Sequence, residues 1–243
     1  MKAESFHIKT KIESFGEGHV FSYQDLGQSD ESTRKMVSRM IGENKLVSLR
    51  NGLFLKPRYN KFLKKNLSAD QTEIMNALLR KEDILPADHT LFYQLNLTPQ
   101  VPMRQAFLIN SESREIKIAD DLFYFIKSPF LINRKNKKIV TILYCLRNIG
   151  KIFESKIEDQ ILKTKSLIFN LNKSQVKQLV NLSVSKDKVV YSALLGALLC
   201  EIPEKCPETV TSLLRDKIKT KISKLNFNAK KYLIHASDWG LIE

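Results

Sequence analysis

The chain has 243 residues, with 40 Lys plus Arg against 26 Asp plus Glu, so its formal net charge is +14. Hydrophobic residues make up 43 % of it and charged residues 27 %, which is ordinary globular usage and excludes general disorder. The length fits one large domain or two small ones. The longest apolar run, residues 189–200, is shorter than the roughly 18 residues that a membrane-spanning helix needs.

The N-terminus and the cysteines predict the compartment. The first turns scatter charged residues along the chain and contain no apolar core of a secretory signal. Three cysteines (Cys145, Cys200 and Cys206) without paired spacing are typical of free thiols in a reducing compartment. We therefore expect a cytoplasmic protein with no membrane partner.

The N-terminal segment predicts three helices. Residues 4–15 carry apolar side chains at helical spacing and are followed by two glycines. Ser22 is the expected cap of a short second helix, which Gly27 ends. Ser29-Asp30-Glu31 supplies a cap and first-turn carboxylates for a third helix, which runs to residue 41 or 42.

The third helix is predicted to have two different faces, because successive residues are turned by 100°. The face expected to be buried consists of Thr33, Met36, Val37, Met40 and Ile41. The opposite face is mostly basic and rich in hydrogen-bond donors, with Arg34 on its flank, and consists of Glu31, Lys35, Ser38 and Arg39.

A hairpin is predicted directly after this helix. Residues 45–50 and 53–56 are two apolar-rich strands separated by Asn51-Gly52, the strongest short-range hairpin signal. Such a dipeptide favours a type I′ turn, in which both central residues have positive φ. In that register Leu49 stands opposite Phe54.

Three helices followed by a hairpin predict a winged helix-turn-helix domain over residues 1–62, whose third helix enters the major groove of DNA. The residues expected to read bases or hold phosphates are Ser32, Arg34, Lys35, Ser38, Arg39, Arg50, Asn51, Lys56 and Arg58. Arg34 and Arg39 are the first choices for sequence readout, because Arg suits bidentate contacts with guanine. Asp30 and Glu31 would repel phosphate, so a winged helix used for protein contacts is an alternative.

The positive charge is concentrated in two blocks. Residues 29–65 hold ten Lys or Arg against three acids, and so do residues 127–165, which gives each block a net charge of +7. Turn signals inside the first block favour nucleic acid over an anionic membrane as its partner. The second block is a candidate surface for DNA, RNA or an acidic protein, or a solvated face. It includes Arg134, Lys135, Lys137, Lys138, Arg147 and Lys151.

The larger C-terminal region, residues 63–243, is predicted to be a second, mixed domain, so the fold class is α+β. Residues 58–68 are expected to be a linker or a helix. A small antiparallel sheet is predicted at about residues 100–130, with a hairpin of residues 101–109 and 114–118 and a further strand at 122–126. Helical patterns follow over residues 139–235 and predict a helical bundle.

Three segments resemble the abortive-infection AbiEi antitoxin family. The first combines Ser-Thr-Arg-x-x-Val-x-x-x-Ile, which begins at Ser32, with Lys-Leu-Val and Arg-Asn-Gly-Leu-Phe. The second runs from Pro86-Ala87-Asp88-His89 to the segment Leu-Asn-Leu-Thr-Pro-Gln-Val-Pro at residues 95–102. The third is Leu-Asn-Phe at 225–227 with Ala-x-x-Trp-Gly-Leu at 236–241. Asn96 stands where the family usually has Gly, Phe92-Tyr93 where Ala-Leu is common, and Gly240 where Asn follows the Trp.

The resemblance implies a DNA-binding antitoxin of a toxin–antitoxin locus, which represses its own promoter through the winged helix. The C-terminal domain would counter a cognate nucleotidyltransferase-like toxin, and in this family neutralisation need not involve direct contact. Two alternatives are a protein-interaction module that binds the toxin without specific DNA binding, and an RNA-binding protein.

No enzyme signature is present in the sequence. The four His are widely separated, and no glycine-rich phosphate loop, nucleophile elbow or zinc pattern occurs. The acidic pairs Asp120-Asp121 and Glu158-Asp159 have surface or capping roles as their simplest explanation, because neighbours in sequence point apart. We therefore expect no catalytic residue, no metal and no cofactor.

Overall fold

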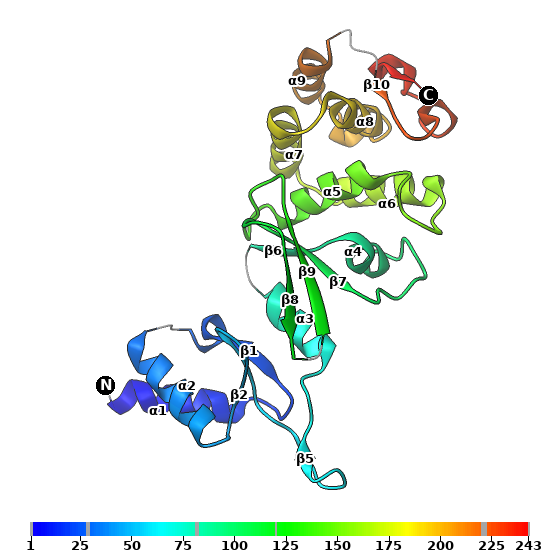
Figure 1. The fold of residues 1–243 in the computed structure, drawn as a ribbon. Coiled ribbons are helices and arrows are strands. Elements are labelled where there is room, and N and C mark those ends of the chain that lie inside the picture. Colours follow the sequence, from blue (N-terminus) through cyan, green and yellow to red (C-terminus); the bar gives the residue numbers. More distant parts are fainter. Residues whose placement is uncertain (1, 28–29, 81–82, 120, 220–222, 243) are drawn as a thin grey trace. The chain divides into compact units, whose positions relative to one another are not determined.

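The computed structural model describes residues 2–27, 30–80, 83–119, 121–219 and 223–242 (Figure 1). The predicted cap Ser29 and the predicted acidic residue Asp120 lie outside these ranges. The fold is mixed α+β and forms two compact units. Unit 1 consists of Met1–Lys81 with Arg114–Tyr124, and unit 2 of Glu82–Ser113 with Phe125–Glu243. The units thus divide the chain elsewhere than at the expected boundary between residues 62 and 63.

Unit 1 begins with a small helical and sheet core. Its elements are α1 (Lys2–Ser14), β1 (Val20–Ser22), the 3-10 helix η1 (Tyr23–Leu26), α2 (Glu31–Gly42), β2 (Val47–Arg50) and β3 (Leu53–Leu55). The strands form an antiparallel sheet in the order β1-β3-β2. The three predicted helical segments are confirmed, whereas β1 was not predicted. One apolar cluster joins α1, α2 and the sheet; it contains Ile8, Ile12, Phe21, Leu26, Met36, Val37, Met40, Leu46 and Phe54.

The hairpin β2–β3 is present, but its predicted register and turn type are wrong. Ser48 stands opposite Phe54 and Arg50 opposite Leu53, so Leu49 lies in a bulge between them. Gly52 has a φ of +76° and is the residue of the Asn51-Gly52 turn with positive φ. A bulge with one left-handed glycine replaces the type I′ turn, which needs positive φ twice.

The rest of unit 1 contains a second hairpin where a linker or helix was predicted. Its strands are β4 (Tyr59–Asn60) and β5 (Lys65–Asn66), which pair antiparallel. Helix α3 (Gln71–Leu79) follows, with Asp70 as its N-cap, and packs on β1. Arg80 at its C-terminus pairs with Asp25 through Nε and Oδ1 at 2.8 Å. α3 therefore belongs to the N-terminal unit.

The larger sheet has the order β6-β7-β9-β8. Its strands are β6 (Ile84–Pro86), β7 (Gln105–Ile109), β8 (Arg114–Ile118) and β9 (Asp121–Lys127). The predicted hairpin of residues 101–109 with 114–118 is wrong, because β9 lies between β7 and β8. Phe123 and Phe125 of β9 are buried, and Phe125 stacks on Phe107 of β7 at 5.7 Å. β8 exposes most of its side chains and suits the sheet edge.

Unit 2 continues as a helical bundle, as predicted. After α4 (Asp88–Gln94) and the sheet come α5 (Lys137–Asn148), α6 (Ile157–Phe169), α7 (Lys173–Lys186), α8 (Val189–Cys200) and α9 (Glu208–Ile218), with short elements β10 (Ser223–Lys224) and β11 (Leu241–Ile242). α8 is buried along nearly all its length and packs against α5, α6, α7 and α9. A Cβ at Gly196 of α8 would lie 2.3 Å from the ring of Trp239, so only glycine fits there. Among the described residues, no helix is long and apolar enough to cross a bilayer.

Candidate nucleic-acid interface

Helix α2 presents a polar face because its other face is held in the core. Asp30 caps the helix, and its Oδ1 accepts the Thr33 backbone N–H at 2.7 Å. The side chain of Thr33 and then this backbone hydrogen bond lower the pKa of Asp30. Thr33, Met36, Val37 and Met40 are buried, as predicted from the helical spacing. The residues left exposed on the other side are Arg34, Lys35, Ser38 and Arg39.

Two of these exposed cations already have carboxylate neighbours. Lys35 Nζ lies 2.7 Å from Glu31 Oε1 and Arg39 Nε lies 3.7 Å from Glu43 Oε1, both one helical turn apart. Arg34 and Ser38 have no partner among the described residues. Exposed pairs of this kind contribute little to stability because water screens them, so a phosphate can replace the carboxylates at small cost. The face is available to an anionic ligand.

The hairpin β2–β3 adds two exposed polar side chains at its turn, Arg50 and Asn51. Lys56, also predicted to contact DNA, has another role in this structure. Its Nζ donates hydrogen bonds to the carbonyl oxygens of Glu13 at 2.7 Å and Phe15 at 2.6 Å. Lys56 thus satisfies carbonyl groups that the end of α1 leaves unpaired. It holds the hairpin to α1 rather than standing free.

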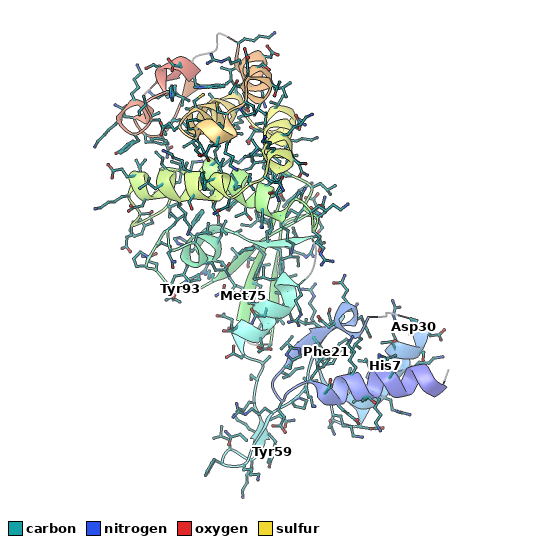
Figure 2. All side chains as sticks on the ribbon, turned by 180° about the vertical axis from the view of Figure 1, so that it is seen from behind. His7, Phe21, Asp30, Tyr59, Met75 and Tyr93 are labelled. Carbon is teal, nitrogen blue, oxygen red and sulfur yellow. The ribbon has the colours of Figure 1, made fainter. Side chains whose placement is uncertain are left out.

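The remaining predicted residues lie beside this face. Ser32 is half-buried at the start of α2, and Arg58 is exposed where the chain enters the hairpin β4–β5. That hairpin carries further exposed residues, Tyr59, Lys61, Phe62, Leu63, Lys64 and Lys65, which were not assigned to the site from the sequence. Figure 2 shows Tyr59 on this hairpin and Asp30 at the start of α2. The run of cations without acids from residue 45 to 65 was the available signal.

The second basic block does not form one free cationic surface. Arg147 donates from Nε to Asp187 Oδ1 at 2.6 Å, and its guanidinium lies 4.6 Å from the ring of Phe130. Asp187 has a fully buried side chain, and burial raises its pKa against the lowering effect of Arg147. Lys151 is exposed beside Tyr191. Arg134, Lys135 and Lys138 are also exposed, and Lys137 is half-buried.

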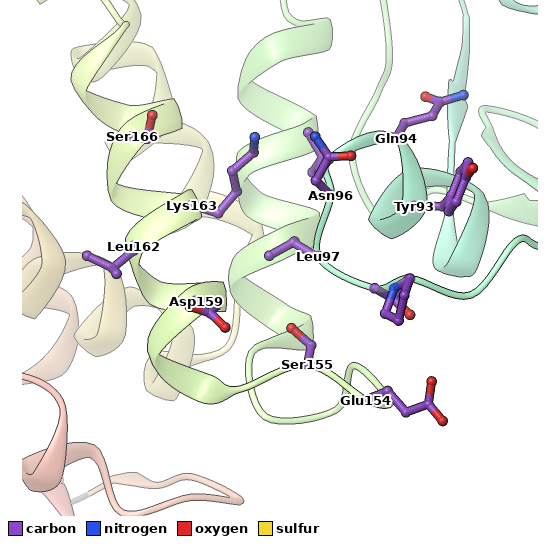
Figure 3. A pocket seen from close by; sticks show the side chains of 13 residues that line it. Tyr93, Gln94, Asn96, Leu97, Glu154, Ser155, Asp159, Leu162, Lys163 and Ser166 are labelled. Atoms are coloured by element: carbon purple, nitrogen blue, oxygen red, sulfur yellow. The ribbon is translucent and has the colours of Figure 1, made fainter.

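Unit 2 contains a hollow of about 910 Å³ that was not predicted (Figure 3). One wall is the family-like segment Leu95–Pro99 and the other is α6, from which Asp159 and Lys163 project. Its lining combines these two charged side chains with Tyr93, Glu154 and Ser155.

A solved structure that the chain resembles is the crystal structure of the RV2827C protein from Mycobacterium tuberculosis, with a TM-score of 0.44 and 10 % sequence identity. That likeness covers 99 % of this chain and 91 % of the other. No curated protein matches the sequence. The model of the Family of unknown function (DUF6088) matches residues 7–179, which is more than half of the chain. The chain therefore belongs to this family.

Proposed function

We propose that residues 1–62 form a winged helix-turn-helix that binds duplex DNA sequence-specifically. In this proposal α2 is the recognition helix, η1 is the preceding short helix that braces it, and the hairpin β2–β3 is the wing. The observation that carries the proposal is the exposed face of α2, where Arg34 and Ser38 have no partner among the described residues. The opposite face of the helix is buried in the core. Such a rigid cationic helix face is suited to groove contacts.

Charge in the same segment supports a polyanionic partner. No Asp or Glu occurs between Glu43 and Asp70, whereas seven Lys or Arg do. Glu31 in the first turn of α2 and Glu43, directly after its last residue, pair with exposed cations, so phosphates can displace them. Release of counterions from DNA would then supply much of the affinity and make it salt-dependent.

The biological role proposed here follows from the family resemblance of the three sequence segments. The protein would repress its own promoter and act as the antitoxin to a nucleotidyltransferase-like toxin, with no catalytic chemistry of its own. The C-terminal region, residues 63–243, would carry the antitoxin role.

A mobility-shift titration tests DNA binding. The probes are duplex DNA from upstream of the protein's own gene and a scrambled duplex of equal length and composition. We expect binding to the upstream duplex to be tighter by about 10³-fold or more. If about six phosphates are neutralised, affinity falls by about 10³-fold between 50 and 200 mM salt. Equal affinity for both duplexes would overturn sequence-specific binding.

The alternative is that α2 contacts the toxin directly, as the acids Asp30, Glu31 and Glu43 on the same helix would allow. Size-exclusion chromatography of the protein with its toxin distinguishes the two. A stable complex formed equally by the wild type and by an Arg34→Ala/Arg39→Ala variant, without DNA binding by either, would favour this alternative.

A further inference from the structure

The hairpin β4–β5 exposes apolar side chains at its tip. Phe62 is 97 % exposed, Leu63 57 % and Tyr59 56 %. We propose that this hairpin is a second DNA-contacting element, which inserts its apolar tip into the minor groove beside the site bound by α2. The inference rests on the proposed function, because the hairpin would reach the same duplex.

Local hydrogen bonds fix the backbone of the tip, although its apolar side chains are exposed in the part of the chain that the structure describes. Asn60 Oδ1 accepts the backbone N–H of Phe62 at 2.9 Å and that of Leu63 at 3.0 Å. Leu67 N–H donates to the carbonyl of Arg58 at 2.9 Å and closes the base. A side-chain turn of this kind fixes the backbone locally without burying apolar surface. The two apolar side chains are therefore held outward in advance of binding, which lowers the entropic cost of inserting them.

Positive charge surrounds the tip. Arg58, Lys61, Lys64 and Lys65 are exposed, and none of these four side chains forms an ion pair with a described residue. Because no carboxylate lies in this part of the sequence, the hairpin has no internal counter-charge. In the proposed complex, the four cations contact phosphates on both sides of the groove. The two apolar side chains between them contact the base step.

The base of this hairpin lies beside the proposed wing. A hollow of about 520 Å³ is lined both by Asn66 and Leu67 of the base and by Val47, Leu49 and Leu55 of the hairpin β2–β3. Two residues of extended strand on each side, at about 3.3 Å each, carry the turn of residues 61–64 about 7 Å from that base. The ribbon extends as a narrow two-stranded arm (Figure 1). In the proposed complex, a duplex held by α2 and β2–β3 would pass beside this arm.

A minor-groove wedge fits this tip better than a membrane surface does. Peripheral membrane elements bury a broad apolar face in the headgroup region. The tip offers two large apolar side chains within a ring of cations, and architectural DNA-binding proteins insert Phe or Leu between base steps in this way. Such insertion kinks the duplex by about 20–90°.

The experiment uses the full-length protein and the upstream duplex, labelled at its two ends for fluorescence energy transfer. The wedge variant is Phe62→Ala/Leu63→Ala, and the conservative control is Phe62→Leu. We expect the wild type and the control to bend the duplex, and the wedge variant to lose most of the bend and bind about tenfold more weakly. A third variant, Lys61→Ala/Lys64→Ala/Lys65→Ala, should reduce the salt slope by about one per lysine removed.

The outcomes separate this inference from the proposed function. If Arg34→Ala/Arg39→Ala weakens binding while all hairpin variants bend and bind as the wild type does, the hairpin proposal alone is wrong. If the wild type has no preference for the duplex, both proposals are wrong. Binding to phosphatidylserine vesicles that depends on Phe62 and Leu63, without their effect on DNA bending, would instead assign the tip to a membrane. Since these side chains are exposed, unchanged circular dichroism should accompany every hairpin variant.

Discussion

The two basic blocks of the sequence have the same net charge but different structural uses. In residues 29–65 the ion pairs join cations to Glu31 and Glu43, which belong to the same block, so the excess of positive charge remains on its surface. In residues 127–165 three cations pair with acids from outside the block. These pairs are Lys127–Glu112, Arg147–Asp187 and Lys165–Glu201.

This difference shows why a charge count alone does not identify a binding surface. Arg147 is separated from Asp187 by forty residues, and Lys165 from Glu201 by thirty-six, so only the fold brings them together. Within the first block each ion pair joins residues that are four positions apart or closer in the sequence. These pairs are exposed and therefore weak. The second block thus uses part of its charge to stabilise unit 2, whereas the first leaves its charge available for a ligand.

The largest expected effect is on DNA affinity in an Arg34→Ala/Arg39→Ala variant. Each arginine that reads a base contributes about 1–3 kcal/mol, so the double variant should lose about thirtyfold to about 10⁴-fold in affinity for the specific duplex. The matched control is Arg134→Ala/Lys138→Ala, which removes two exposed cations of the second block. Fluorescence anisotropy measures both. An equal loss in the control variant would refute the distinction between the blocks.

A stability effect should follow from Arg147→Ala. Removing the guanidinium leaves the buried Asp187 carboxylate without its partner, which costs about 3 kcal/mol of unfolding free energy. Trp239, the single tryptophan, is buried in unit 2, so its fluorescence during urea unfolding reports this unit. Arg134→Ala, at an exposed position, should change the value by less than about 0.5 kcal/mol. Similar stability of the two variants would contradict the structural role of Arg147.

Loss of the Asp30 cap should have a smaller effect, confined to unit 1. Asp30→Ala removes the acceptor of the Thr33 N–H and should speed hydrogen exchange of the first amides of α2. The folded-state pKa of Asp30 is lowered, so its contribution is present above the ordinary Asp pKa and is lost as the pH falls through the folded value. If the hydrogen-exchange protection of these amides in the wild type stayed the same as the pH was lowered, Asp30 would not act as the cap.

The smallest effect concerns a thiol that reports the integrity of α5. Burial raises the pKa of Cys145 to about 12, so little of the reactive thiolate forms near neutral pH. Cys145 should resist iodoacetamide at pH 8 in the wild type and become labelled faster in Arg147→Ala, as mass spectrometry can measure. Rapid labelling of the folded wild type would show that α5 is not packed as described.

Local patterns predicted the parts of the fold that local interactions determine. The buried face of α2 followed from its 3.6-residue spacing, and the hairpin at Asn51-Gly52 from its turn residues. Asn96 has a φ of +56° and ends α4 in a left-handed conformation, with hydrogen bonds from Asn96 and Leu97 back to Tyr93 and Phe92. Asn and Gly are the residues that most readily adopt this left-handed conformation at the end of a helix.

The parts of the fold that were not predicted depend on contacts between residues far apart in the sequence, or on a bulge of one residue that changes the strand register. The position of β9 between β7 and β8 is set by burial of Phe123 and Phe125 against residues that its own sequence does not specify. The bulge at Leu49 changed the register of one hairpin, and the cap formed by Lys56 on α1 joins residues about forty positions apart. The hairpin β4–β5 lacks a turn signal such as Asn-Gly, so its basic sequence resembled a linker.

In the proposed complex, the duplex contacts the cationic face of α2 and the turn of β2–β3, and not the second basic block. Backbone amide chemical shifts of the isotopically labelled protein, recorded during titration with the upstream duplex, test it directly. We expect the largest shifts at residues 32–39 and 50–52, with little change at residues 134–151. Shifts concentrated in residues 134–151, or no shifts with a duplex in excess, would contradict the account.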